Sequence, residues 1–341
     1  MSFPMSLPEH LISPTFVHAL HIPGLVLEHP AIMVANLNLR RLEWIEWWIL
    51  ENSDVAERLK AEFENGLHTF LVVERPDFQG NDAAATVLES GDAERLHLLV
   101  TALRIAKQGL LRNPSGSMQY TRRHDLNKRT PGLFGRSLFE PDMAKQYKLR
   151  ADDITLVEAI MADISHPEVV EERTIQLALR HFDASYDHYL DREERLLHAF
   201  TALEATYGEY KKQARPIKGI SLGQAAAALW PQVTGVHISK FLDEKTQARG
   251  LRNAAAHGDF TNWPSKQTDV MIEQLREILR VGLRCLLKMA VQKKSLKNEL
   301  ENISLGLSST PAKAAFQNVL SNAARGSSSA VGLLQKLISS K

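Results

Sequence analysis

The chain has 341 residues and almost balanced charge, with 41 Lys and Arg against 40 Asp and Glu. Its length suits about two domains. Its 44% hydrophobic and 24% charged residues are ordinary for a folded protein and exclude a disordered chain, a collagen and a disulfide-rich scaffold. The single cysteine, Cys285, allows neither a disulfide within the chain nor a cysteine-based zinc site.

The N-terminal segment predicts a cytoplasmic protein. Its first ten residues, MSFPMSLPEH, lack the basic region and apolar run that mark a secretory signal. No apolar stretch approaches the ~20 residues that a bilayer-spanning helix needs. Because a chain with one cysteine suits a reducing compartment, we expect a cytoplasmic protein with no membrane partner.

The charge is distributed unevenly along the chain. Residues 101–150 hold 11 Lys and Arg but 3 Asp and Glu, a net charge of +8, whereas residues 151–210 hold 4 and 14, a net charge of −10. The sequence pattern also becomes helical after residue 150. We therefore predict a mixed α/β sensor or recruitment domain at 1–149, a helical bundle at 150–294, and a flexible tail at 295–341. The tail is rich in Ser, Ala, Gly and Lys and allows one or two marginal helices.

The first part is predicted to be an α+β domain. Residues 39–53 (LRRLEWIEWWILENS) fit either a short helix or a buried strand. Residues 67–73 (LHTFLVV), bounded by a glycine and a proline, are predicted to form a strand. Residues 96–105 fit a strand or a helix, because an apolar run alone does not distinguish the two. Residues 113–135 contain several Pro and Gly and are predicted to be rich in turns.

The second part is predicted to be an all-α bundle of five or six helices. Its first helix is capped by Asp152 and Asp153, runs to about Ile164 and is broken at His166-Pro167. A later helix begins at Asp191, where an acidic first turn suits the helix dipole. The remaining helices are predicted at residues 168–188, 222–230 and 238–257, and from Pro264 to about Lys288 or beyond.

The most informative segment is LRNAAAHGDF, residues 251–260. Asn253 and His257 lie one helical turn apart on a shared face, whereas the Cα–Cβ bond of Arg252 points about 140° away from that of His257. A long Arg side chain can still curl back towards a common anion, and two copies meeting across a dimer axis would bring the two groups together better. The three alanines between them leave room for a phosphate backbone or a partner helix, or simply pack tightly against a neighbouring helix. The spacing of the Arg and the His is common by chance. The Asn after the Arg, the Gly after the His and the position on the penultimate long helix make the segment distinctive.

With this segment and the upstream helix ERLLHAFTALEATYG, residues 150–290 resemble the HEPN superfamily, most closely its Apea-like branch. The resemblance implies an HEPN-like helical bundle, usually dimeric, and in many members a metal-independent endoribonuclease. It assigns catalysis to Arg252, Asn253 and His257, without a cofactor or metal ion. It also implies antiphage defence or a toxin–antitoxin system. The expected partners are RNA, a second copy of the chain in a homodimer, and an antitoxin or a phage-derived trigger.

The chemistry of RNA cleavage suits these side chains. A histidine either removes the 2′-hydroxyl proton or protonates the leaving oxygen, and a guanidinium stabilises the charge that grows on the phosphate. Asn253 is expected to hold His257 or a phosphate oxygen. His257 lies near a helix C-terminus, where the dipole favours the protonated form, so we expect it to act as the acid or as half of an acid–base pair across a dimer. The alternative is a non-catalytic HEPN-fold protein that binds RNA or nucleotides, or dimerises.

The basic segment 118–129 (MQYTRRHDLNKR) has several interpretations. It either tracks an RNA backbone, forms a solvated loop or hairpin, or docks on the acidic helices of residues 151–210. The RNA-binding candidates in and beside it are Tyr120, Arg122, Arg123, Lys128 and Arg129. Glu204 either pairs with Arg252 or is an ordinary helix glutamate.

Several tryptophans and histidines belong to residue types that bind bases or metal ions in other proteins, but a structural role fits most of them better. Three tryptophans form either a base-stacking shelf or, with more physical support, a core or interface anchor: Trp44, Trp47 and Trp48. The early histidines lack the spacing of a metal site: His10, His18, His21 and His29. His181 and His188, seven residues apart, bind a metal or lie on the surface. The sequence has no G-x-S-x-G, P-loop or Rossmann motif, which argues against the hydrolases, NTPases and dehydrogenases that use them.

Overall fold

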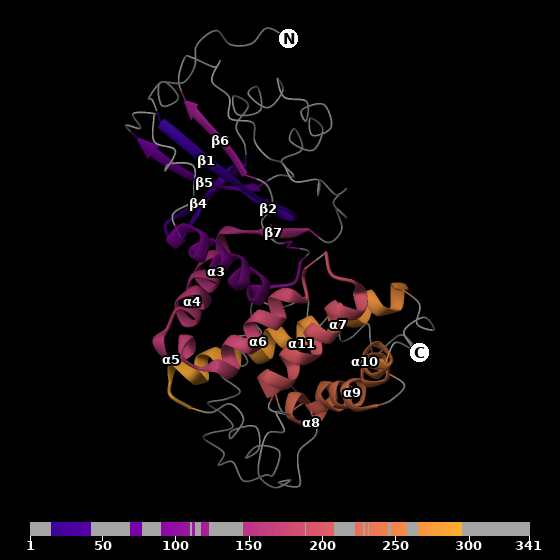
Figure 1. Ribbon diagram of the computed structural model, residues 1–341. Helices are drawn as coiled ribbons and strands as arrows, with labels where there is room; N and C mark the ends of the chain where they lie inside the picture. Colours follow the sequence, from indigo (N-terminus) through magenta and orange to yellow (C-terminus); the bar gives the residue numbers. More distant parts are fainter. Residues whose placement is uncertain are drawn as a thin grey trace. The chain divides into compact units, whose positions relative to one another are not determined.

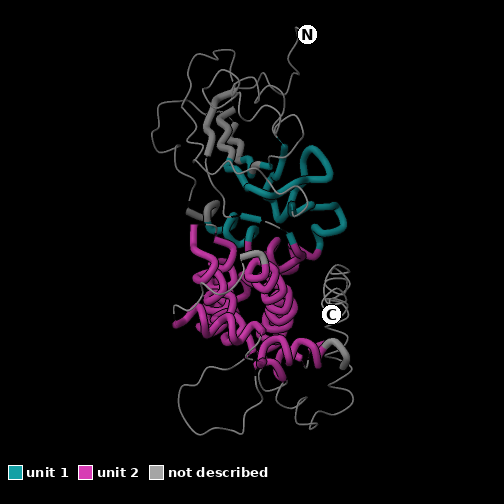
Figure 2. The backbone as a smooth tube through the Cα atoms, turned by 90° about the vertical axis from the view of Figure 1, so that its right-hand side faces the viewer, with its two compact units in different colours: residues 1–100, 109–155 teal, residues 101–108, 156–341 magenta. Residues whose placement is uncertain are grey.

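The computed structural model describes residues 15–41, 69–76, 90–109, 111–112, 117–122, 146–187, 189–207, 222–227, 229–230, 232–244, 247–257 and 265–294. The chain divides into two compact units, which Figure 2 colours separately. Unit 1 comprises residues 1–100 and 109–155, and unit 2 comprises residues 101–108 and 156–341. The sequence predicts one boundary near residue 150, and the contacts group residues 101–108 with the helical unit as well.

Unit 1 is built on a five-stranded antiparallel sheet (Figure 1) with the order β3-β4-β5-β1-β6. Its strands are β1 (Thr15–Ile22), β3 (Ala31–Val34), β4 (Leu37–Arg41), β5 (Thr69–Pro76) and β6 (Ser117–Arg122). A two-residue turn joins β3 to β4, and there Ala35 and Asn36 have φ values of 47° and 62°. Such a turn matches the right-handed twist of the strands it connects.

A second, two-stranded parallel sheet and one helix complete unit 1. The sheet pairs β2 (Leu25–Leu27) with β7 (Tyr147–Leu149), although more than a hundred residues separate them in the sequence. Helix α3 (Ser90–Ala106) begins in unit 1, and its residues 101–106 belong to unit 2. Apolar side chains from both sheets are fully buried, among them Leu25, Leu39 and Leu71, so that unit 1 has an apolar core.

Several predictions for the first part can be compared with these elements. The strand predicted at 67–73 is confirmed by β5, shifted towards the C-terminus. The ambiguous run 96–105 is helical, because α3 continues over it. Of residues 39–53, those up to Arg41 lie in β4 and the rest lie outside the described residues. The turn-rich segment 113–135 contains the strand β6.

Unit 2 is helical. After a 3₁₀ turn at Ala151–Asp153, its helices are α4 (Ile154–Ile164), α5 (Pro167–Val170), α6 (Arg173–Ala184), α7 (Arg192–Tyr207), α8 (Leu222–Ala227), α9 (Gln232–Asp243), α10 (Ala248–His257) and α11 (Ser265–Val291). The long helix α11 packs against α5, α6 and α7, while α10 packs against α7 and α9 (Figure 1). The strands therefore precede a region whose described residues are mostly helical, as the sequence predicts.

Small residues bring α7 and α11 into close contact. Gly282 of α11 lies against Tyr207 of α7, because a Cβ atom at residue 282 would meet the phenol ring and its oxygen. The buried Tyr207 hydroxyl donates a hydrogen bond to the carbonyl of Ile278, 2.8 Å away. Burial raises the pKa of Tyr207 well above its ordinary value, so this hydroxyl keeps its proton and remains a donor.

The single helix predicted at 168–188 is wrong, because the structure has two helices there. The chain leaves α5 at Glu171, and the Glu172 side chain accepts a hydrogen bond from the backbone N–H of Thr174 at 3.2 Å. This contact caps the N-terminus of α6. A local cap therefore overrides an apolar pattern that runs through both helices.

The single helix predicted at 238–257 is also wrong, because α9 ends at Asp243 and α10 begins at Ala248. Neither Gly nor Pro marks this break. The Asp243 carboxylate accepts hydrogen bonds from Gly223 N–H of α8 at 3.1 Å and from the Ser239 hydroxyl at 3.3 Å, which ties the end of α9 to α8. The break lets α9 pack against α8 and α10 pack against α7. Tertiary packing here outweighs local helix propensity.

Three helix predictions are confirmed. Helix α4 ends at Ile164 before His166-Pro167, α7 covers 192–207, and α11 begins directly after Pro264. At the start of α4, the Asp153 carboxylate accepts a hydrogen bond from the Arg150 N–H at 2.9 Å. The predicted tail at 295–341 lies outside the described residues.

Candidate functional site

Helix α10 carries all three predicted catalytic residues in its last six positions. Arg252 and Asn253 are half-buried, whereas His257, the last residue of the helix, is exposed. Asn253 and His257 are four residues apart in a continuous helix, so they share a face. The helical positions predicted from the sequence are therefore present, and the imidazole of His257 is accessible to solvent.

The guanidinium of Arg252 bridges α10 to α7. Its Nη2 lies 3.2 Å from Glu204 Oε1, and its Nη1 donates to Asn253 Oδ1 over 3.4 Å. The side chain of Arg252 is 40% exposed and that of Glu204 is 29% exposed. Of the two alternatives for Glu204, the structure has the one in which it pairs with Arg252. The carboxylate fixes the guanidinium and partly neutralises it, while leaving it open to solvent.

Within one copy of the chain, Arg252 and His257 do not form a joint contact. The helical period directs them about 140° apart, and no hydrogen bond joins them among the described residues. A phosphate held by Arg252 is therefore reached by His257 only through a bent substrate or from a second copy of the chain.

The basic segment predicted to bind RNA falls in unit 1, on and after the edge strand β6. Tyr120 is paired in register with Val17, and Arg122 with Thr15, both in β1. The other three candidates, Arg123, Lys128 and Arg129, lie outside the described residues, as do the three tryptophans.

The remaining histidine candidates are dispersed. His18 and His21 lie in β1, His21 is buried, and His29 is exposed. His181 of α6 contacts His198 of α7, a residue that the sequence analysis did not select. His10 and His188 lie outside the described residues. In the described part of the chain, no group of three or more His, Cys, Asp or Glu side chains is placed to hold a metal ion.

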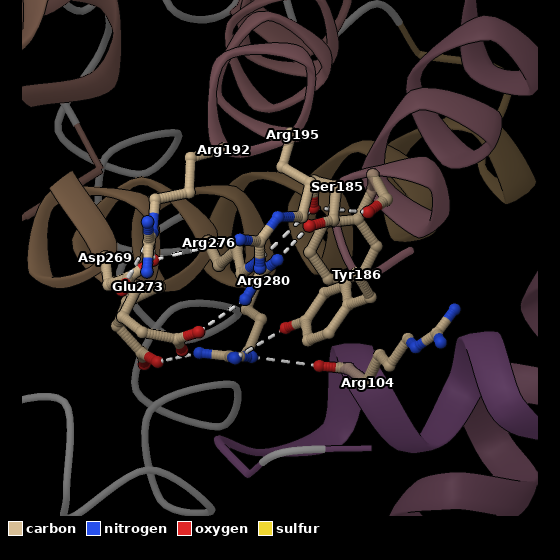
Figure 3. A network of polar contacts seen from close by, with 11 residues as sticks. Arg104, Ser185, Tyr186, Arg192, Arg195, Asp269, Glu273, Arg276 and Arg280 are labelled. Carbon is tan, nitrogen blue, oxygen red and sulfur yellow. Dashed lines mark hydrogen bonds and ion pairs between the residues drawn. The ribbon is translucent and has the colours of Figure 1, made fainter. Parts of the chain in front are cut away.

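Sequence reasoning missed a buried network of arginines between α11, α6 and the last turn of α3 (Figure 3). Arg280, 2% exposed at its side chain, donates from Nη2 to the Tyr186 hydroxyl at 2.7 Å and from Nε to the carbonyl of Arg104 at 2.9 Å. It also pairs with Glu277. One turn further along α11, Arg284 Nε donates to the carbonyl of Ile105 at 2.9 Å.

The aromatic ring of Tyr186 lies between two further guanidinium groups. The Cζ atoms of Arg276 and Arg104 are 4.0 Å and 4.7 Å from the ring centroid, distances typical of cation–π contacts. Arg104 Nη1 pairs with Asp183 Oδ1 at 2.9 Å, and Arg276 donates to the Ser185 hydroxyl at 3.3 Å and to its carbonyl. Burial raises the pKa of Tyr186 although the nearby arginines oppose this, so the phenol stays protonated. The network is a closed structural core, since its cations already contact carboxylates, carbonyls and an aromatic ring.

One sequence feature pointed towards this network. Arg276, Arg280 and Arg284 follow one another at intervals of four residues along α11, so they form one row on the helix. All three are nearly buried. The row alone does not reveal its partners, because the carbonyls that accept from Arg280 and Arg284 are more than 170 residues away in the sequence.

Comparisons with known proteins add no relative from which a function can be transferred. No protein-family model, no curated protein and no solved structure matches the chain. Of the helices that the structure describes, none is both long and apolar enough to cross a bilayer. The side chains that bear on function are therefore Glu204 of α7 and the three candidate residues of α10.

Proposed function

We propose that this chain is a metal-independent endoribonuclease with an HEPN-like helical domain. Arg252 binds the scissile phosphate, His257 transfers the proton, and Asn253 holds His257 or a phosphate oxygen. The observation that carries the proposal is the contact between Arg252 and Glu204, which presents a half-exposed guanidinium on the same short helix as an exposed imidazole. The resemblance of residues 150–290 to HEPN domains supplies the reaction type and the setting, which is antiphage defence or a toxin–antitoxin system in the cytoplasm.

Two charged groups of complementary role suffice for this reaction. A guanidinium donates paired hydrogen bonds to phosphate oxygens and gains strength as negative charge accumulates on them. As the 2′-hydroxyl oxygen bonds to phosphorus, its proton passes to a neutral imidazole or to water; the bond from phosphorus to the 5′ oxygen breaks, and a protonated imidazole gives that leaving oxygen its proton. His257 is exposed at the end of α10, so its imidazole is accessible to the leaving oxygen of a bound RNA.

The proposal favours two copies of the chain over one. Because the Cα–Cβ directions of Arg252 and His257 diverge around α10, one copy directs both at a single phosphate only with a bent RNA or a curled arginine side chain. In a homodimer with α10 near its axis, Arg252 of one copy and His257 of the other converge on the RNA. Mixing inactive His257→Ala protein with inactive Arg252→Ala protein then restores part of the activity, since each mixed dimer keeps one intact pair.

Cleavage of a labelled RNA in the presence of EDTA tests the proposal. We expect His257→Ala to slow cleavage by roughly 10²–10⁴-fold, the usual contribution of a proton-transfer group. Arg252→Ala should slow it by roughly 10²–10³-fold, the usual cost of removing one donor to a developing negative charge. Arg249→Ala and His237→Ala are matched controls, because both residues are exposed on α10 and α9 and neither belongs to the proposed site. The controls should cleave like the wild type, and growth arrest of a bacterial host should follow the same pattern. Equal cleavage by wild type and His257→Ala overturns the proposal.

One observation favours a second candidate, a non-catalytic HEPN-fold module that binds RNA or nucleotides. The guanidinium of Arg252 already has a carboxylate partner, which is sufficient to explain Arg252 as a structural contact between α7 and α10. This candidate predicts RNA binding, or dimerisation, without cleavage under any condition. A gel-shift measurement beside the cleavage assay therefore separates the two candidates.

A further inference from the structure

Two imidazole rings meet across the seam between α6 and α7. The Nδ1 atoms of His181 and His198 are 2.7 Å apart, and their ring centroids are 4.9 Å apart with planes inclined by 33°. Both side chains are half-buried. In the described part of the chain, no hydrogen bond or ion pair joins either ring to another residue, so each imidazole nitrogen of this contact depends on the other ring.

A nitrogen–nitrogen distance of 2.7 Å requires one proton between the two atoms. One Nδ1 must carry a hydrogen and donate it, while the other must present its lone pair and accept. With both rings neutral, the two histidines therefore adopt opposite tautomers. Adding one proton to the pair turns the contact into a charge-assisted hydrogen bond, which is stronger. Adding a second proton places an N–H on both facing atoms, and the contact is then repulsive.

A metal ion does not account for this geometry. A first-row metal bonds each imidazole nitrogen at about 2.0–2.1 Å, so two ligands only 2.7 Å apart would enclose an angle well below the tetrahedral value. The described residues also supply no third ligand, since no group of three candidate side chains occurs among them.

We propose that His181 and His198 share a single proton near neutral pH and form a pH-sensitive contact that holds α6 against α7. When acidification protonates both rings, the contact breaks and the seam between the two helices loosens. This inference is independent of the proposed ribonuclease activity, because it rests on the two rings alone.

The surroundings of the pair disfavour the doubly protonated state. Burial, then the charge of His198 and then the charge of Arg180 lower the pKa of His181. One turn before His198 on α7, the exposed Glu194 accepts a hydrogen bond from the Asp191 N–H and not from either ring. The helices packed on α6 or α7 are α5, α8, α10 and α11. Among their described residues, no charged side chain makes a hydrogen bond or ion pair with either imidazole, and so no carboxylate there is paired with a second proton.

The direction of the pH effect follows from this lowered pKa. Between the pKa of folded His181 and its unfolded value of about 6.5, the unfolded chain binds more protons than the folded chain. For the proton that makes the pair doubly charged, the stabilisation is therefore present above about pH 6.5 and is lost as the pH falls through the lowered pKa of folded His181. Each unit by which the pKa is lowered corresponds to about a tenfold fall in the folding equilibrium constant.

Nuclear magnetic resonance of the full-length protein with ¹⁵N-labelled histidine tests this inference between about pH 5 and pH 8. We expect a through-hydrogen-bond coupling between the two Nδ1 nuclei at neutral pH, and its loss in acid. In His198→Gln, His181 should titrate at a higher pH than in the wild type, because a cation no longer forms beside it. His237→Gln is the matched control, since His237 is exposed on α9 and outside the pair.

Urea unfolding at about pH 7.5 and pH 5.5 provides the second measurement. The wild type and His237→Gln should lose more stability on acidification than His198→Gln does. The inference is overturned if His181 titrates at the same pH in wild type and His198→Gln, or if the wild-type spectrum shows no coupling between the two nitrogens. The spectrum decides the question even where His198→Gln does not fold.

Discussion

Arg252 is held 3.2 Å from Glu204 Oε1, yet 40% of its side chain remains exposed. In the proposed site, this carboxylate positions the guanidinium and also repels the phosphate that the guanidinium is meant to bind. A half-exposed ion pair contributes about 0–1 kcal/mol, because water screens both partners. Replacing the carboxylate therefore changes RNA binding by a small and measurable amount.

We expect Glu204→Gln to bind RNA up to about fivefold more tightly than the wild type, which corresponds to the upper end of that range. Cleavage should become slower at the same time, since the guanidinium loses the group that orients it. Fluorescence anisotropy with a labelled RNA measures the affinity, and a single-turnover assay measures the rate.

Glu193→Gln is the matched control for this change. It removes one negative charge from an exposed position of the same helix, eleven residues before Glu204 and thus ~16 Å away along the axis. General electrostatic attraction would make both variants bind RNA more tightly by the same factor. That result would show that Glu204 acts only through the total charge and would remove it from the site.

Helix α11 illustrates how one element combines an apolar core with buried cations. Its arginine row binds carbonyl groups of Ser185 and Arg104, which lie at the C-terminal ends of α6 and α3. The last carbonyls of a helix have no hydrogen-bond donor within the helix and carry its negative partial charge. A guanidinium group therefore stabilises them in two ways, by donating a hydrogen bond and by supplying a positive charge. The arginine row thereby fixes how α11 packs against the C-terminal ends of α6 and α3.

We expect Arg280→Ala to lower the free energy of unfolding by about 3–5 kcal/mol, because Glu277 would stay buried without its cation. The Tyr186 hydroxyl and the carbonyl of Arg104 would also lose their donor. Urea unfolding followed by circular dichroism measures the change. Arg249→Ala, on the exposed side of α10, should change stability by less than about 0.5 kcal/mol. Similar losses in both variants would contradict a structural role for the network.

Helices with a strong periodic pattern and a clear terminator were predictable from the sequence. This holds for α4 before Pro167, for α7, and for α11 after Pro264. The two predictions of a continuous helix were wrong for a physical reason. The Glu172 cap begins a new helix, and the contact of Asp243 with α8 ends another, although neither break contains Gly or Pro. Strand and helix were indistinguishable in residues 96–105, where the apolar run suits either.

The candidate site was predictable only in part. A helical segment fixes the angular relation of Arg252, Asn253 and His257, so their arrangement on α10 followed from spacing alone. The partner of Arg252 was left open between two alternatives, because contacts between separate helices depend on packing angles that sequence patterns do not contain. The same reason explains why His198 and the partners of the arginine row were missed.

The division of the whole chain into two units has one consequence for how its helical part folds. Residues 101–108 belong to unit 2, although 47 residues of unit 1 separate them from the next part of that unit at 156. They supply the carbonyls that accept from Arg280 and Arg284, and the Arg104 guanidinium that pairs with Asp183. The helical unit is thus assembled from two distant stretches of the sequence, whereas the predicted domain at 150–294 contains one.

A fragment of residues 150–294 should therefore fail to fold cooperatively. It retains buried Asp183 without Arg104, and two buried guanidiniums without their carbonyl partners. Removing one partner of a buried ion pair costs about 3–5 kcal/mol, losing a hydrogen bond to a charged group costs about 1.5–3 kcal/mol, and a typical domain has only about 5–15 kcal/mol of stability to lose. A fragment in which residues 90–108 are joined to 150–294 by a flexible Gly/Ser linker restores these contacts and should show a single urea transition. If the two fragments unfold at the same urea concentration, α3 is not an integral part of the helical unit, and the sequence-predicted boundary describes the folding unit better than the contacts do.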